Sequence, residues 1–208
     1  MTPVTGRLSP RRDLLILGLV GFVTSFGAHA VAVNLPAYAQ QVGGGPFTIG
    51  LLIAVYDFAE VIAKPVLGYW ADKRGQVVTL WAGLAVFSLA SLAFLVVDPR
   101  LLIAVRLFQG LGASAFSVVS VALVAAYFPQ ERGQSLGVYN ALKGAGYVVA
   151  PVMGGYIVTR TSLAGLFVVS ALIGLTVLAL SFLLHEPARP VELDDDDDFS
   201  LKDFLVPR

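Results

Sequence analysis

Five ionisable side chains lie inside long apolar stretches of the sequence, where burying a charge costs free energy and usually marks function. Two are acids, Asp57 and Glu60, and three are cations, Lys64, Arg106 and Lys143. Burial favours the protonated form of a carboxyl group, and a nearby cation favours its ionised form. A carboxyl group that moves between these two settings can load and release a proton. We therefore predict that Asp57 or Glu60 carries a coupled proton. Arg106 or Lys143 is the expected cation that competes with it.

The spacing of these residues also predicts how their helix faces its neighbours. At 100° per residue, Asp57, Lys64 and Gly68 lie in one line along a helix, and Glu60 lies beside that line. We expect this face to point into the helix bundle. An alternative for Glu60 is equally strong, because Lys64 follows it by four residues and the two can form a static ion pair.

Other residues in the apolar stretches are weaker candidates for chemistry. His29 is expected to be a hydrogen-bonded packing residue rather than a proton carrier. Five aromatic residues could line a substrate cavity, although packing explains most of them equally well: Tyr38, Tyr56, Phe58, Tyr139 and Tyr147.

The composition places all of these residues in a membrane protein. Hydrophobic residues make up 57% of the 208 residues and charged residues 13%, whereas soluble domains have about 25% charged residues. The chain has no cysteine and only two histidines, which excludes disulfides, thiolate metal ligands and a histidine metal cluster. The net charge is zero, and no nucleophile with its base and no phosphate loop is evident. We expect an integral membrane protein that is not an enzyme, with no cofactor, metal or nucleic-acid partner.

Six apolar stretches are long enough to cross a bilayer, which takes about 20 residues in a helix. Because each is continuously apolar, they predict an all-α bundle of transmembrane helices at residues 14–38, 48–70, 77–97, 101–128, 134–158 and 163–184. The predicted regions are a cytoplasmic amino terminus at 1–13, the six-helix bundle at 14–185, and a cytoplasmic segment at 186–208. This last segment contains an acidic linker with the run Asp194 to Asp198. Ser200 and Asp203 then have the spacing of a capping box that opens a further helix.

Basic residues predict the orientation of the bundle in the membrane. Two of those near the ends of the stretches fall on one side, Arg100 and Arg160, and seven fall on the other. The seven are Arg7, Arg11, Arg12, Lys73, Arg74, Arg132 and Arg189. We expect a multi-pass protein of the plasma (inner) membrane, with both termini and the turn at residues 68–76 in the cytoplasm.

A short internal similarity suggests two inverted three-helix repeats. The second stretch contains PVLGYW from Pro65, and the fifth contains PVMGGY from Pro151. With the predicted orientation, the first lies near the cytoplasmic end of its helix and the second near the external end. Inversion of three-helix units would place them so. The alternative is chance, since Pro and Gly are common in membrane helices.

The turn between the second and third stretches reads GYWADKRGQ and resembles a known signature. It is similar to the G-x-x-x-D-[RK]-x-G-[RK] motif of the major facilitator superfamily, with Gly68, Asp72, Lys73 and Gly75 in place and Gln76 where a basic residue is usual. The resemblance implies the amino-terminal six-helix half of a twelve-helix transporter. It also implies that Asp72 meets a helix of the second half and holds a cytoplasmic gate shut. Gly68 would allow close helix approach, and Gly75 suits a tight turn. The alternative is a plain cytoplasmic turn.

Two further motifs narrow the resemblance. In RLFQGLGAS, Arg106 and Gly110 resemble the R-x-x-x-G signature of the family's fourth helix. The fifth stretch is similar to the G-x8-G-x3-G-P-x2-G-G signature of proton-coupled antiporters, chiefly drug exporters, except that Ala150 precedes the proline. The matching residues are Gly137, Gly146, Pro151, Gly154 and Gly155. The alternative is an ordinary kinked helix rich in small residues.

Three functional hypotheses follow. The first is the amino-terminal half of a secondary active transporter that exports small apolar or cationic compounds in exchange for protons. The second is a half-size membrane subunit that works by assembly with itself or with a partner, and the third is a truncation that transports nothing. The expected partners are the lipid bilayer, protons, a small-molecule substrate and a second six-helix half. That half could be covalently joined, on a separate chain, or a second copy in a homodimer.

Overall fold

The structure, a computed structural model, describes residues 10–41, 45–98 and 101–187. It contains six long helices that are apolar enough to cross a membrane, which confirms the six predicted stretches. They are α1 Pro10–Gln41, α2 Pro46–Arg74, α3 Gln76–Ala93, α4 Leu102–Tyr127, α5 Arg132–Arg160 and α6 Leu163–Ser181. The acidic run and the Ser200 capping box lie outside the described residues.

Two helices end earlier than the sequence predicts. The third stretch was expected to reach residue 97 and the sixth residue 184, but α3 ends at Ala93 and α6 at Ser181. Beyond each end, the backbone forms hydrogen bonds from residue i+3 to residue i, such as Leu95 N to Leu92 O and Leu183 N to Leu180 O. The apolar composition continues there although the α-helix has tightened into turns.

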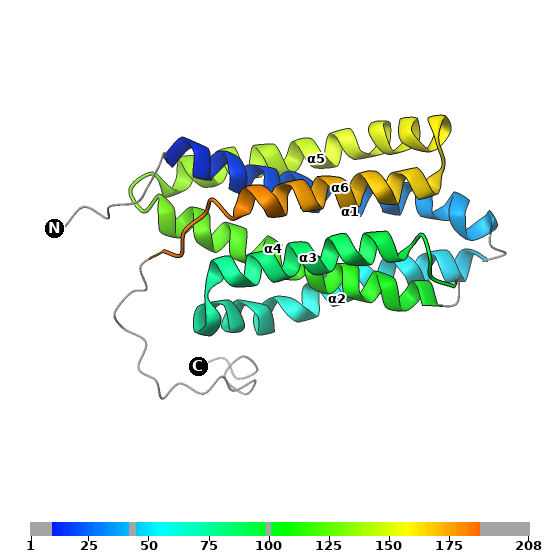
Figure 1. The fold of residues 1–208 in the computed structure, drawn as a ribbon, viewed down its shortest axis with the longest axis horizontal. Coiled ribbons are helices and arrows are strands. Elements are labelled where there is room, and N and C mark those ends of the chain that lie inside the picture. The colour runs from blue at the N-terminus through cyan, green and yellow to red at the C-terminus, as the bar shows by residue number, and fades with distance from the viewer. Residues whose placement is uncertain (1–9, 42–44, 99–100, 188–208) are drawn as a thin grey trace.

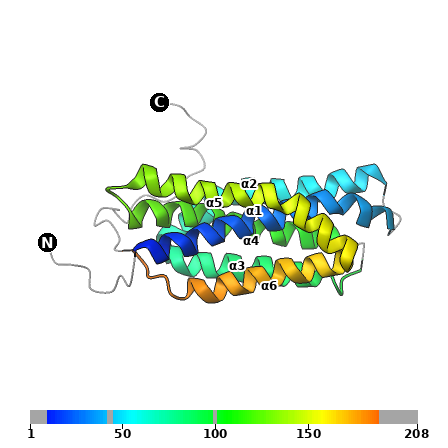
Figure 2. The same ribbon diagram turned by 90° about the horizontal axis from the view of Figure 1, so that it is seen from above.

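The helices lie roughly side by side, with the start of α1, the α2–α3 turn, the α4–α5 connection and the exit of α6 at one end (Figures 1 and 2). The largest buried cluster gathers apolar side chains from all six helices. Two thirds (67%) of the most apolar 18-residue window is buried in both α1 and α4, but only 22% of that window in α2 and 17% in α5. The bundle therefore has α1 and α4 at its centre and leaves α2 and α5 largely uncovered.

The pattern of contacts is consistent with the predicted inverted repeat. α2 packs mainly on α4, and α5 packs mainly on α1, rather than on their neighbours in the sequence. Exchanging α1–α3 with α4–α6 maps these two contacts onto each other and the α3–α6 contact onto itself. Pro65 and Pro151 lie inside the two matching helices, α2 and α5.

Candidate functional site

The Asp72 turn joins α2 to α3 through a single residue, Gly75. Its φ of 115° and ψ of 137° lie where residues with a side chain are strained. Its N–H donates to the carbonyl of Ala71 at 2.9 Å. Gly68, about two turns earlier, faces α4, but a Cβ there would meet Val118 at an ordinary 3.6 Å. The glycine that the turn requires is therefore Gly75, and the close helix approach expected at Gly68 is absent between α2 and α4.

Asp72 itself is exposed, and the two cations that follow it fold back along α2. The Lys73 ammonium lies 5.0 Å from the centre of the Tyr69 ring, and the Arg74 guanidinium lies 5.8 Å from that of Trp70. Such cation–π contacts hold the bases along the helix wall. The Asp72 carboxylate is left on the end surface of the bundle.

Arg106 of α4 is the largest fully buried side chain, 1% exposed. Its Nε donates to the carbonyl of Leu52 at 3.1 Å and its Nη1 donates to Oε1 of Gln109 at 2.8 Å. The guanidinium also lies 4.4 Å from the centre of the Tyr56 ring. The cation is thus held by groups of α2 and α4 that carry no formal charge.

Gln109 is in turn braced from α3. Its Nε2 donates to the hydroxyl of Ser91 at 3.0 Å, and that hydroxyl donates to the carbonyl of Phe87 at 2.8 Å. Sequence reasoning missed both residues. Gln109 follows Arg106 by three positions, so helical spacing could have signalled it. Ser91 carries no comparable signal, because it reaches the site only through the packing of α3 on α4.

The two acids of α2 take different positions. Glu60 pairs with Lys64 at 2.9 Å, so the ion pair predicted from their spacing is present. Asp57 is exposed, so the expectation that its face points into the bundle is wrong for this residue. The buried positions of α2 are Leu52, Tyr56, Ala59 and Ala71. This face turns inward because it meets α4 closely at Gly110, where a Cβ would lie 2.5 Å from the carbonyl oxygen of Tyr56. From its exposed position, Asp57 still interacts electrostatically with Arg106.

Lys143 of α5 is half-buried against α1, where a Cβ on Gly21 would lie 3.2 Å from the Cβ of Lys143. The charges of Glu60 and Lys64 act on it, although α2 and α5 do not pack on each other. The charged side chains of the two least buried helices therefore face a common region.

His29 makes the contacts that were predicted for a hydrogen-bonded packing residue. His29 is half-buried, and its Nδ1 lies 3.0 Å from the carbonyl oxygen of Ser25, which accepts a hydrogen bond from it. Its ring packs edge-on against Tyr147 with 4.1 Å between ring centres. Both contacts are those of a packing residue.

The aromatic residues do not gather in one cavity. Tyr56 and Tyr139 are buried in the core, and the Tyr139 hydroxyl shares a hydrogen bond of 2.7 Å with Ser120. Phe58 is 64% exposed on α2, and Tyr147 is 43% exposed on α5. The side chain of Tyr38 lies outside the described part of the chain.

The antiporter-like motif divides between two faces of α5. Gly146, Ala150 and Gly154 follow one another at intervals of four and are buried, and both glycines lie against α1. A Cβ on Gly146 would lie 2.6 Å from the carbonyl oxygen of Phe22. Alanine in place of glycine at position 150 is accommodated within this buried stripe. The other three residues of the motif lie outside it: nothing lies within 4 Å of a Cβ on Gly137 or Gly155, and Pro151 is exposed.

The chain belongs to the Major Facilitator Superfamily, whose family model matches residues 3–206. Multidrug resistance protein Stp of Mycobacterium tuberculosis is 30% identical over 176 residues, which cover 83% of this chain and 33% of that protein. Quinolone resistance protein NorA of Staphylococcus aureus is 24% identical over 180 residues, 86% of this chain and 46% of that protein. An uncharacterized MFS-type transporter of Methanocaldococcus jannaschii is 23% identical over 177 residues, 84% of this chain and 46% of that protein. The chain spans between a third and a half of the length of these relatives.

Proposed function

We propose that this chain is the amino-terminal half of a twelve-helix, proton-coupled exporter of small apolar or cationic compounds. Membership of the family supports transport, and the resistance proteins among its relatives support export. The proposed setting is the inner membrane with both chain termini in the cytoplasm. This follows from the distribution of basic residues and from the position of the α1 start and the α6 exit at the same end of the bundle (Figure 1).

The observation that carries the proposal is the charged, uncovered surface of α2 and α5. Asp57 is exposed on α2, the Glu60–Lys64 pair lies half-buried on the same helix, and Lys143 is half-buried on α5. A charge at the bilayer centre costs about 2.5–3.5 kcal/mol on insertion scales. These side chains are therefore expected to face protein or a water-filled path rather than lipid. A second six-helix half placed against α2 and α5 would supply both.

In this arrangement the charges have distinct roles. Asp57, or Glu60 when its pair with Lys64 opens, would carry the proton. Arg106 and Lys143 are the cations that favour proton release. Asp72 would meet a helix N-terminus of the second half and hold the cytoplasmic side closed while the outer side is open. The outer surface of the α5 motif, at Pro151 and Gly155, would lie against the second half.

The same surface also supports assembly of two separate chains, because it needs a covering partner and not a covalent link. A homodimer, or a complex with another six-helix chain, is therefore the second candidate. The two candidates differ in what this chain does alone in a membrane.

The test compares vesicles that contain this chain alone with vesicles that contain it joined to a second six-helix half. Dye or drug efflux is measured under an imposed pH gradient, and native mass spectrometry gives the number of copies. We expect gradient-driven efflux only from the joined form. Efflux by a dimer of this chain would establish assembly instead. The absence of gradient-driven movement from either form, with correct insertion and bound ligand, would overturn proton-coupled export.

A further inference from the structure

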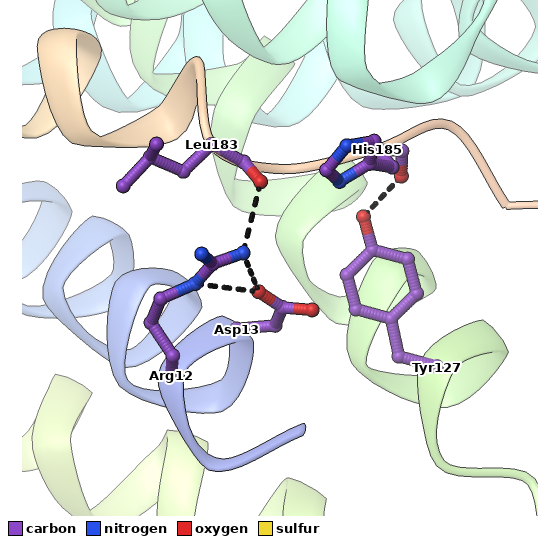
Figure 3. A network of polar contacts seen from close by, with 5 residues as sticks. All are labelled: Arg12, Asp13, Tyr127, Leu183 and His185. Atoms are coloured by element: carbon purple, nitrogen blue, oxygen red, sulfur yellow. Dashed lines mark hydrogen bonds and ion pairs between the residues drawn. The ribbon is translucent and has the colours of Figure 1, made fainter. Parts of the chain in front are cut away.

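The segment that leaves α6, residues 182–187, is held across the end of the bundle by contacts from three other helices. Figure 3 shows two of them: the Tyr127 hydroxyl of α4 donates to the carbonyl of His185, and Nη2 of Arg12 in α1 donates to the carbonyl of Leu183 at 3.2 Å. Arg12 is itself paired with the buried carboxylate of Asp13 at 3.0 Å. In α3, the Trp81 ring packs on Phe182 with 4.7 Å between ring centres. We call residues 182–187 the exit segment.

Glu186 of the exit segment binds the start of α3. Its Oε1 accepts a hydrogen bond from the backbone N–H of Gln76 at 2.5 Å, and its Oε2 accepts one from that of Val77 at 2.9 Å. The first N–H groups of a helix have no partner within the helix, and a carboxylate is favoured there by the helix dipole. The residue at the N-cap position is Gly75, which has no side chain to supply a cap. Glu186, which lies 110 positions beyond Gln76, supplies the cap instead.

The carboxylate of Glu186 also lies against Gly75. A Cβ on Gly75 would lie 3.3 Å from Oε2 of Glu186, a tight contact. The glycine thus serves the geometry of the turn and leaves room for the acid. Because Gly75 alone separates α2 from α3, any group that fixes the first turn of α3 also fixes the direction in which α2 ends. Asp72 lies in that last turn of α2.

We propose that Glu186 is a positioning residue for the Asp72 turn. Its two hydrogen bonds hold the α2–α3 junction, so that a displacement of the exit segment is transmitted directly to the surface that carries Asp72. The cap is formed entirely by residues of this chain and needs no second half. Its effect on a cytoplasmic gate rests on the function proposed above.

The first test measures the hydrogen exchange of the Gln76 and Val77 amides by mass spectrometry, with the whole chain in nanodiscs. Glu186→Ala removes both acceptors, whereas Glu186→Gln keeps one carbonyl oxygen. We expect exchange about five-fold faster in the alanine variant, the size of effect that follows from losing a typical cap, and an intermediate rate in the glutamine variant. The graded order is a signature that general loosening of the bundle would not give. Unchanged exchange in both variants would overturn the cap.

The matched control is Tyr127→Phe, which keeps the ring and removes the hydroxyl that donates to the carbonyl of His185 in the exit segment. It should leave exchange at Gln76 and Val77 at the parental rate. An equal increase in Tyr127→Phe would mean that the exit segment as a whole, and not Glu186, holds the turn, and the assignment to Glu186 would be wrong. If the alanine variant does not fold, exchange in the glutamine variant still tests whether Glu186 caps the start of α3.

A second measurement separates this inference from the proposed function. Glu186→Gln is placed in a form joined to a second half, and substrate efflux is measured beside exchange. Faster exchange with reduced efflux supports both the cap and its effect on the gate. Faster exchange with unchanged efflux would mean that Glu186 caps α3 but has no effect on the proposed gate. Unchanged exchange in both Glu186→Gln and Glu186→Ala removes the cap, whatever the efflux.

Discussion

At the scale of single residues, Arg106 is buried inside the bundle, whereas Asp57 is exposed on its surface. Arg106 is enclosed and bonded to neutral groups of α2 and α4, so its charge is fixed inside the six-helix bundle. Asp57 lies on the outer surface of α2, within electrostatic reach of that charge.

Asp57→Asn is the sharpest test of this arrangement. In a form joined to a second half, the variant should retain ligand binding but lose efflux driven by a pH gradient, because the neutral amide resembles a permanently protonated acid. Efflux from vesicles and ligand binding are measured separately. Parental efflux would remove Asp57 from the coupling site.

Glu60→Gln is the companion variant on the same helix. Its effect should be smaller than that of Asp57→Asn, because Glu60 is engaged with Lys64 at 2.9 Å. A larger loss in Glu60→Gln would transfer the coupled proton from Asp57 to Glu60. If both neutral variants kept the parental rate, the coupling would lie outside these two acids.

At the scale of helices, the contact between α1 and α5 depends on small residues at intervals of four. Gly146, Ala150 and Gly154 share the buried stripe of α5, and Gly146 comes closest to the α1 backbone. The stripe explains part of the antiporter-like motif as packing. Gly137, Pro151 and Gly155 lie outside this stripe, and the proposed contact of Pro151 and Gly155 with a second half stays a prediction.

Gly146→Ala should destabilise the chain by about 1–3 kcal/mol, the usual cost of overpacking. The reason is that the added Cβ would lie 2.6 Å from the carbonyl oxygen of Phe22. The matched control is Gly155→Ala in the same helix, where nothing lies within 4 Å. Unfolding of the purified chain in detergent measures both. Equal stability of the two variants would contradict the assigned α1–α5 contact.

Asp72→Ala addresses the turn between α2 and α3. Because Asp72 is exposed, we expect normal insertion and stability, but reduced transport and a more accessible cytoplasmic side in a form joined to a second half. Glu131→Ala is the control, since Glu131 is an exposed acid in the α4–α5 connection at the same end of the bundle. If neither variant changed transport or accessibility, Asp72 would be an ordinary acid of a cytoplasmic turn.

At the scale of the whole molecule, the described residues form a multi-pass bundle of six helices. The start of α1 and the exit of α6 lie at the same end of it (Figures 1 and 2). α1 and α4 form its centre, whereas α2 and α5 leave charged side chains uncovered. The molecule therefore has a packed side and a side that we propose meets a second half.

Cysteine labelling tests the orientation of the bundle, and the absence of native cysteine leaves no background. Cysteines introduced at Gly44 and Arg160 should react with an impermeant reagent from outside the cell. One introduced at Arg74 should react only after the membrane is opened, because basic residues favour the cytoplasmic side. External labelling at Arg74 would reverse the proposed topology.

The sequence by itself determined the features that depend on neighbouring residues. Continuous apolar stretches predicted all six helices, because length and composition suffice to span a bilayer. The four-residue spacing of Glu60 and Lys64 predicted their ion pair, and Gly75 after the charged residues predicted the tight turn. The helix ends at Ala93 and Ser181 were missed, because the apolar composition does not change where the helix tightens.

Only the tertiary structure decided which side of α2 faces inward. The helical period places Asp57, Lys64 and Gly68 in one line. It does not determine whether that line or the neighbouring apolar line through Tyr56 faces the bundle interior. The close contact of α4 with the Tyr56 backbone made the choice. Likewise, Arg106 meets Leu52 across 54 positions, Gln109 meets Ser91 across 18, and Gln76 meets Glu186 across 110. No local pattern encodes these pairs, because each depends on how separate helices pack and where their ends come together.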